Sequence, residues 1–247
     1  MKGVFVTLLS LLPALALAAA GSIGIYEEYG LWQMLVYLLA CILFFPVASI
    51  LHELGHMLFG AVCGMRVKIS KTAIFRPSGC AVRPLRSMAV RTRFILTALG
   101  GLILNFVFTV VGMGFLFASG GLLWVSLAAP SSFYLFMINV LPLNYAAGDT
   151  DMLLAVQAMK NTAEWQVLGR VLKIQGMLAE GKNIADIDEN YFYSVPQIAE
   201  YEPAFIMLVS LRADYYAAKG EEVRAQEWKQ RLEGLLREYA PESVTEQ

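Results

Sequence analysis

The sequence predicts an all-α membrane protein: a bundle of about four transmembrane helices, a short β-hairpin after the second helix, and a soluble helical domain at the C-terminus. Three observations predict this class. Of the 247 residues, 57% are hydrophobic and only 16% are charged, whereas a soluble domain is about half apolar and about a quarter charged. Four segments are long and apolar enough to span a bilayer. The last 96 residues have an ordinary soluble composition, with ten basic and fifteen acidic side chains.

The four apolar segments cover about residues 4–20, 31–62, 94–118 and 122–143. The run 94–148 carries no charged residue. It is too long for one crossing of about 20 residues, so we expect two antiparallel helices with a turn at Gly120-Gly121. The first segment also fits a secretory signal peptide, because Lys2 precedes it and alanines end it. A retained helix is the favoured interpretation, and the signal peptide stays open.

Charge placement predicts the orientation. Residues 64–93 carry eight basic side chains and no acid. The positive-inside rule puts this loop, and with it the C-terminal segment, in the cytoplasm. The acidic pair Glu27-Glu28 should then lie in an outward-facing loop, on the same side as the Gly120-Gly121 turn. We expect an integral, multi-pass protein of a bacterial cell membrane. The net charge of −1 gives no reason to expect a nucleic-acid partner.

The basic loop and the tail have their own patterns. Basic and β-branched residues alternate over 65–74, Pro77-Ser78-Gly79 is a turn signal, and 80–83 can return as a second strand. The tail from 152 reads as helical, with helices over 204–219 and 221–239 separated by Gly220. The resulting domains are 1–30 (first helix and outer loop), 31–155 (membrane core) and 156–247 (cytoplasmic helical domain). A regulatory protein docking on the last domain is a possible partner.

One motif carries chemistry. Leu51-His52-Glu53-Leu54-Gly55-His56 is an HExxH sequence, and it contains both histidines of the chain. Positions i and i+4 share one face of a helix, so two imidazoles can bind one zinc ion. Glu53 can then accept a proton from water that the metal has acidified. Histidine and glutamate are costly in an apolar helix and are usually functional there.

A catalytic zinc site generally has three protein ligands and one open position. No histidine remains for the third, and the three cysteines have no metal-binding spacing. Acids are therefore favoured. Asp149 and Asp151 end the uncharged stretch, on the same predicted side as the HExxH sequence. Asp151 is preferred, and Asp149 is the alternative, either as a ligand or as a helix N-cap.

At this point residues 31–155 resemble the site-2 protease family of intramembrane metalloproteases. In that family an HExxH helix is followed by a later Asn-x-x-Pro motif and an Asp-Gly pair, whose aspartate is the third zinc ligand. Asn139 and Pro142 match that motif, but Asp151 is followed by Met152 instead of glycine. The stretch Leu99–Asn105 is similar to the glycine-rich step and asparagine of the family's third helix. The resemblance implies active-site or substrate contacts for Asn105 and Asn139.

The resemblance implies a function. His52, His56 and Asp151 would hold Zn²⁺, Glu53 would be the catalytic base, and the substrates would be transmembrane proteins cleaved in or beside the lipid bilayer. Two other classes stay open. The missing glycine is compatible with a non-proteolytic scaffold or zinc-binding regulator on the same fold. A transporter would need polar residues along several helices, which the uncharged run 94–148 does not supply.

Overall fold

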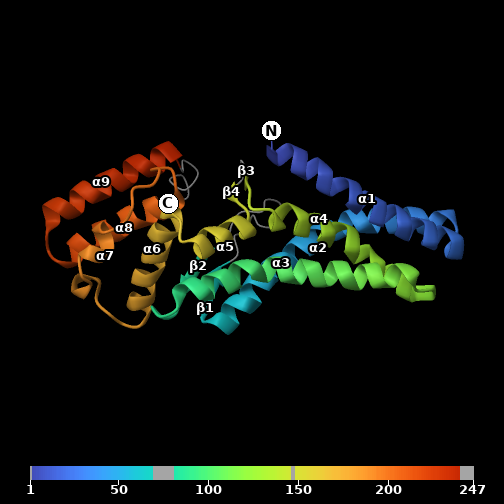
Figure 1. Ribbon diagram of the computed structural model, residues 1–247, viewed down its shortest axis with the longest axis horizontal. Helices are drawn as coiled ribbons and strands as arrows, with labels where there is room; N and C mark the ends of the chain where they lie inside the picture. The colour runs from blue at the N-terminus through green and yellow to red at the C-terminus, as the bar shows by residue number, and fades with distance from the viewer. Residues whose placement is uncertain (1, 69–80, 146–147, 240–247) are drawn as a thin grey trace. The chain divides into compact units, whose positions relative to one another are not determined.

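The computed structural model describes residues 2–68, 81–145 and 148–239, and within these ranges the chain forms nine α-helices and two small strand pairs. Figure 1 shows the order of these elements along the chain. The residues group into two compact units, one made of 1–82 and 94–156 and the other of 83–93 and 157–247. The predicted turn at 77–79 and most of the loop around it lie outside the described residues.

Four helices of the first unit are long and apolar enough to cross a membrane, as the sequence predicts. The first helix is longer than expected. Helix α1 runs over Lys2–Tyr29, so the acidic pair Glu27-Glu28 belongs to its last turn and not to a loop. Gly30, at φ 88°, ends it in a backbone conformation that few other residues adopt. Glu28 accepts a hydrogen bond from the Gly120 amide, which brings the two predicted outer segments together.

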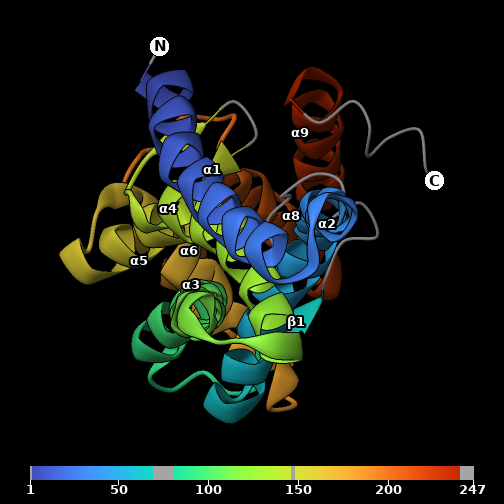
Figure 2. The same cartoon turned by 90° about the vertical axis from the view of Figure 1, so that its right-hand side faces the viewer.

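Helix α1 packs across α2 (Leu31–Cys63) and α4 (Ala128–Val140), as Figure 2 shows. A side chain at Gly21 would meet the Tyr37 hydroxyl, so α1 and α2 can approach only because this position is bare. Tyr37 Oη lies 2.7 Å from Ser126 Oγ, and Ser131 Oγ donates to the Cys41 carbonyl. These buried polar contacts join helices where water is scarce, which is where such bonds are most needed.

The last apolar segment is not one α-helix. It begins as a 3₁₀ segment, η2 (Gly120–Leu127), which follows α3 (Val90–Gly114) and the short η1 (Phe115–Phe117). Helix α4 then ends at Val140, three residues before the predicted end. The cause is Pro142, because a residue before proline is driven out of the helical region; Leu141 is extended, at φ −86° and ψ 132°.

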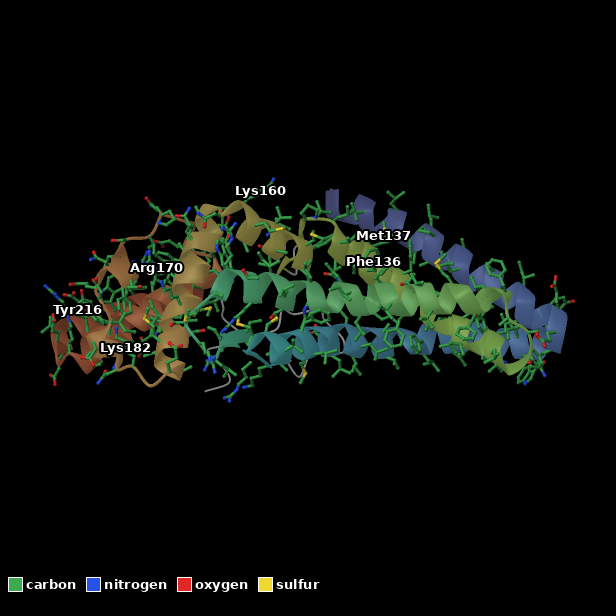
Figure 3. All side chains as sticks on the ribbon, turned by 60° about the horizontal axis from the view of Figure 1, so that its bottom comes forward. Phe136, Met137, Lys160, Arg170, Lys182 and Tyr216 are labelled. Atoms are coloured by element: carbon green, nitrogen blue, oxygen red, sulfur yellow. The ribbon has the colours of Figure 1, made fainter. Side chains whose placement is uncertain are left out.

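Two strand pairs flank the helices. Strands β1 (Met65–Lys68) and β2 (Ala81–Pro84) form the predicted hairpin sheet after α2, although the residues between them lie outside the described ranges. Strands β3 (Asn144–Tyr145) and β4 (Gly148–Asp149) were not predicted. They pair antiparallel, with Asn144 opposite Asp149, and lead into α5 (Asp151–Lys160). Between α3 and α4, the rings of Phe106 and Phe136 pack with centroids 5.4 Å apart, and Figure 3 labels Phe136.

The second unit is a helical domain. Its helices are α6 (Ala163–Ala179), α7 (Asn190–Tyr193), α8 (Pro203–Ala218) and α9 (Glu222–Tyr239), with a 3₁₀ turn, η3, at Ile184–Asp186. The predicted break at Gly220 is confirmed: this glycine lies between α8 and α9 at φ 75°. Fully buried side chains from α6, α7 and α8 form one core: Val171, Ile174, Phe192, Leu208 and Tyr215.

A buried cation fixes the helical domain. Arg212 is 9% exposed and donates twice to the Phe192 carbonyl, from Nε at 3.1 Å and from Nη2 at 2.7 Å. Its guanidinium also lies over the rings of Tyr193 and Trp228, at 4.6 and 4.8 Å. The planar guanidinium of this α8 residue therefore contacts both α7 and α9, and a lysine cannot reproduce this geometry.

We therefore expect Arg212→Lys to lower the free energy of unfolding of this domain by about 1–3 kcal/mol. A lysine keeps the charge, but it has no planar guanidinium to lie over both rings while it donates twice to the Phe192 carbonyl. The thermal unfolding midpoint of the purified chain measures this. Arg224→Lys is the matched control, since Arg224 is exposed and lies over a single ring, that of Tyr216. Equal midpoints for the two variants would contradict the role assigned to Arg212.

Candidate metal centre

The two histidines of α2 face the same point. His52 and His56 are one helical turn apart, and their side chains are buried, with 7% and 3% of each residue exposed. Their Nε2 atoms lie 3.2 Å apart. Two imidazole nitrogens at this distance cannot both carry a proton toward each other, so the arrangement presents at least one free lone pair.

The third member of the group comes from α5. Asp151 Oδ2 lies 2.9 Å from His52 Nε2, and Asp151 Oδ1 lies 3.4 Å from His56 Nε2. Although it is close to His52, Oδ2 is buried and receives no well-directed hydrogen bond among the described residues. His52, His56 and Asp151 therefore form a group that could hold a metal ion, with one ligand atom from each.

Asp151 is held as a carboxylate. Burial raises the pKa of its carboxyl group, but interactions with His52 and His56 together outweigh burial and hold the pKa below its usual range. Asp151 is also the first residue of α5, where the helix dipole favours a negative charge. A ligand to a cation must be deprotonated, and this position meets that condition.

Helix α3 closes the site by an unusually close backbone approach. A Cβ atom at Gly55 would lie 2.4 Å from the Gly100 carbonyl oxygen, and one at Gly100 would lie 2.5 Å from that of Gly55. The obstacle in each case is backbone, which cannot rotate away. The two helices can touch here only because both positions lack a side chain, which is how glycine pairs allow close packing in membranes.

Three residues of α3, four positions apart, then face the histidines. The Thr97 carbonyl accepts from His56 Nδ1 at 2.8 Å, which leaves Nε2 of that ring free. A Cβ atom at Gly101 would lie 2.6 Å from His56 Nε2 and 2.7 Å from His52 Nε2, so the missing side chain keeps space at the ligand atoms. Asn105 contacts His52 Nδ1 at 2.9 Å through its amide group.

The Asn105 amide can fix the tautomer of His52. Its Nδ2 faces His52 while its buried Oδ1 has no hydrogen-bond partner among the described residues. Rotation of the amide by 180° exchanges the two ends. The oxygen then accepts the Nδ1 proton of His52, and Nε2 keeps its lone pair for a cation. Partners of this kind orient metal-ligating histidines and set their tautomer.

The other predicted site residues are placed as follows. Glu53 is buried on α2, 6% exposed, and interacts electrostatically with His56. Asn139 donates from its amide to the Leu135 carbonyl of its own helix, at 3.1 Å. Asp149 accepts a hydrogen bond from Asn144 across the β3–β4 pair, and is not in the group that could hold a metal.

Asp149 is also not the N-cap of α5, which corrects one expectation. Thr150 has that role: its Oγ1 accepts from the Leu153 amide at 3.2 Å and donates to the Leu141 carbonyl at 2.8 Å. The Thr150 amide donates to the Leu143 carbonyl at 3.1 Å. This buried threonine closes the loop from α4 to α5 and so fixes where Asp151 begins the helix. Its position before an apolar helical run was the available sequence signal.

No protein-family model, curated protein or solved structure matches this chain. The function is therefore inferred from the chain's own residues and their geometry.

The choice between the two aspartates gives a prediction about the metal centre. Asp151→Asn removes the negative charge of the carboxylate ligand, since the other two ligands are neutral imidazoles, and we expect the metal content of the purified chain to fall by tenfold or more. Asp149→Asn should leave the metal content unchanged, because Asp149 accepts a hydrogen bond from Asn144 and is not one of the three residues that could hold a metal. Elemental analysis after dialysis measures both. Loss of metal from the Asp149 variant alone would reverse the assignment.

Gly101 gives a second prediction. Gly101→Ala would place a methyl group at the two Nε2 atoms, and we expect metal binding to be lost while the helix content is kept. Gly114→Ala is the control on the same helix, because a Cβ atom there meets nothing within 4 Å. Metal content and far-UV circular dichroism report the two properties. A Gly101→Ala variant with a full complement of metal would show that the cation does not lie under α3.

Proposed function

We propose that this chain is an intramembrane zinc metallopeptidase that hydrolyses peptide bonds of membrane-embedded proteins. The observation that carries the proposal is the convergence of three ligand atoms. Two of them and the buried Glu53 belong to α2, a helix apolar enough to cross a membrane, and the third belongs to Asp151 of α5. Buried ionisable groups in such a helix are costly, and they are retained where they serve a function.

Zinc fits the donor set. Two imidazoles and one carboxylate are a common catalytic zinc set, and tetrahedral ligands at about 2.0–2.1 Å from zinc lie roughly 3.3 Å from one another. Here the two Nε2 atoms are 3.2 Å apart, Asp151 Oδ2 is 2.9 Å from His52 Nε2, and the other carboxylate oxygen, Oδ1, is 3.4 Å from His56 Nε2. One ligand atom from each residue lies within 4.8 Å of the other two. His52, His56 and Asp151 would hold the ion. When bound, zinc supplies a Lewis acid that polarises a carbonyl group and makes water acidic at neutral pH.

Glu53 would transfer the proton of the attacking water. Glu53 lies directly beside His52 in sequence and is buried on the same helix, so its carboxylate can accept a proton from the attacking water. It would pass this proton to the leaving amine as the peptide bond breaks. Thr97 and Asn105 would hold the two imidazoles in position during these steps.

The substrate class follows from the surroundings. The site lies near the end of α2, within a candidate span, so the accessible peptide bonds belong to segments in or beside the bilayer. Such segments are helical in lipid, and a helix hides its peptide bonds, so a substrate would unwind locally before cleavage. With the basic residues of 64–93 in the cytoplasm, the site and the C-terminal domain would face the cytoplasm of a bacterial cell.

Replacing Glu53 tests the proposal. We expect Glu53→Gln to keep its zinc and to lose cleavage of a panel of single-pass membrane proteins by about 10²–10⁴-fold, the usual contribution of a general base. The conservative change keeps size and polarity, and bound zinc shows that the site is intact. If the unmodified chain and the Glu53→Gln variant both bind zinc and give the same cleavage, the protease proposal is wrong. A zinc-binding scaffold or regulator would then be the function.

A further inference from the structure

A second site lies in the helical unit. A pocket of about 420 Å³ opens between the segment before α3, one face of α6 and the residues after α7. This volume is in the range of small-molecule sites. On α6 the lining residues follow the pattern i, i+3, i+4 and i+7, so they share one helical face: Gln166, Gly169, Arg170 and Lys173. Gly169 lies over the Trp165 ring, where a Cβ atom would be 3.2 Å from the ring, and its bare position leaves room there.

The pocket is strongly basic. Arg91, Arg170 and Lys173 line it, and none of its described lining residues is acidic. None of these three cations forms a salt bridge with an acid among the residues the structure describes. Three positive charges around one cavity repel one another, so their arrangement has an electrostatic cost that a bound anion would relieve.

The cations are oriented and not simply solvated. The Arg170 guanidinium and the Lys173 ammonium both lie over the ring of Tyr191, at 4.8 and 5.2 Å. Arg91 donates to the Met159 carbonyl through one of its amino groups, which leaves its other donors available. Hydroxyl and amide groups complete the lining: Ser87, Asn161, Gln166 and Ser194. The lining thus offers several hydrogen-bond donors around one small space, which suits a group with many acceptor oxygens.

From this cavity we infer a binding site for a phosphate group, held by Arg91, Arg170 and Lys173. Phosphate is the matching anion because its three or four oxygens accept charge-assisted hydrogen bonds from several cations at once. The phosphate has two sources, a soluble ion or the headgroup of an anionic lipid. Val90 and Arg91 are the first two residues of α3, a candidate membrane span, so the pocket includes the end of such a helix. Basic residues directly beside a transmembrane helix attract anionic lipid headgroups.

The site would link the chain to its surroundings. Ser87 donates twice to the Glu180 carboxylate, from its amide at 3.2 Å and its hydroxyl at 2.7 Å. The backbone of Arg86 and Ser87 also lies against Gly176 of α6. A phosphate between Arg91 and Arg170 would add a third connection between α6 and the start of α3, and so strengthen the attachment of this segment to the helical domain.

Binding is tested on the full chain in detergent, with two probes: radiolabelled inorganic phosphate, and phosphatidic acid in mixed micelles, with phosphatidylcholine as the uncharged-surface reference. The variant is Arg170→Gln/Lys173→Gln. The matched control is Lys182→Gln/Lys229→Gln, which removes the same charge from exposed positions of the same domain. Figure 3 labels Arg170 on α6 and Lys182 beyond the end of that helix.

We expect saturable binding of a phosphate probe to the unmodified chain and the control, and binding about tenfold or more weaker in the variant. Binding of inorganic phosphate would identify the soluble source, and binding of phosphatidic acid alone would identify the lipid source. Because Lys173 is exposed, Lys173→Glu is a second variant that keeps the fold, with Lys182→Glu as its control. Equal binding of both probes by all variants, or lipid binding that phosphatidylcholine matches, would overturn the site.

Discussion

The close contact between the α2 and α3 backbones is the constraint on which the metal centre depends. At Gly55 and Gly100 there is no room for a side chain on either helix. This contact sets the register of α3 against α2. The helical period then determines which residues of α3 face the histidines. Thr97, Gly101 and Asn105 follow one another at intervals of four, so they form one stripe that meets both imidazoles. One stripe thus supplies a carbonyl acceptor, an open space and an amide.

The second requirement is that α5 begins at the right residue. Pro142 ends α4, and the loop that follows is folded back by the β3–β4 pair and by Thr150. Thr150 is 3% exposed and hydrogen-bonds to the Leu141 carbonyl and to the amides of Leu143 and Leu153. Asp151 follows as the first residue of α5, with its carboxylate among the histidines. A short polar network therefore fixes the residue at which α5 begins.

Local sequence patterns predicted several residues of the metal centre, but they could not predict how the helices pack around it. The pairing of His52 with His56 follows from the helical period alone. Asn105 was predicted from the resemblance of Leu99–Asn105 to a family motif. Even so, that Gly101 borders the ligand atoms depends on where two helices cross, and no local pattern contains that register. The same applies to Asn139, which has the motif position but hydrogen-bonds to its own helix. The end of α4 was predictable from Pro142, whereas the 3₁₀ start at Gly120 has no clear sequence signal.

The basic loop shows how one set of charges can serve two purposes. Its eight cations are the sequence's argument for orientation. In the structure Arg91 lines a cavity with two cations of α6, and Ser87 nearby is bonded to Glu180. A charge with a local structural or binding role is weaker support for topology, since it would be needed on either side of a membrane. Arg66 and Lys68 have exposed side chains on β1 and no such role in the described contacts. Their positive charges are therefore the clearest indication of which end of α2 faces the cytoplasm. They directly follow this helix, which holds the histidines.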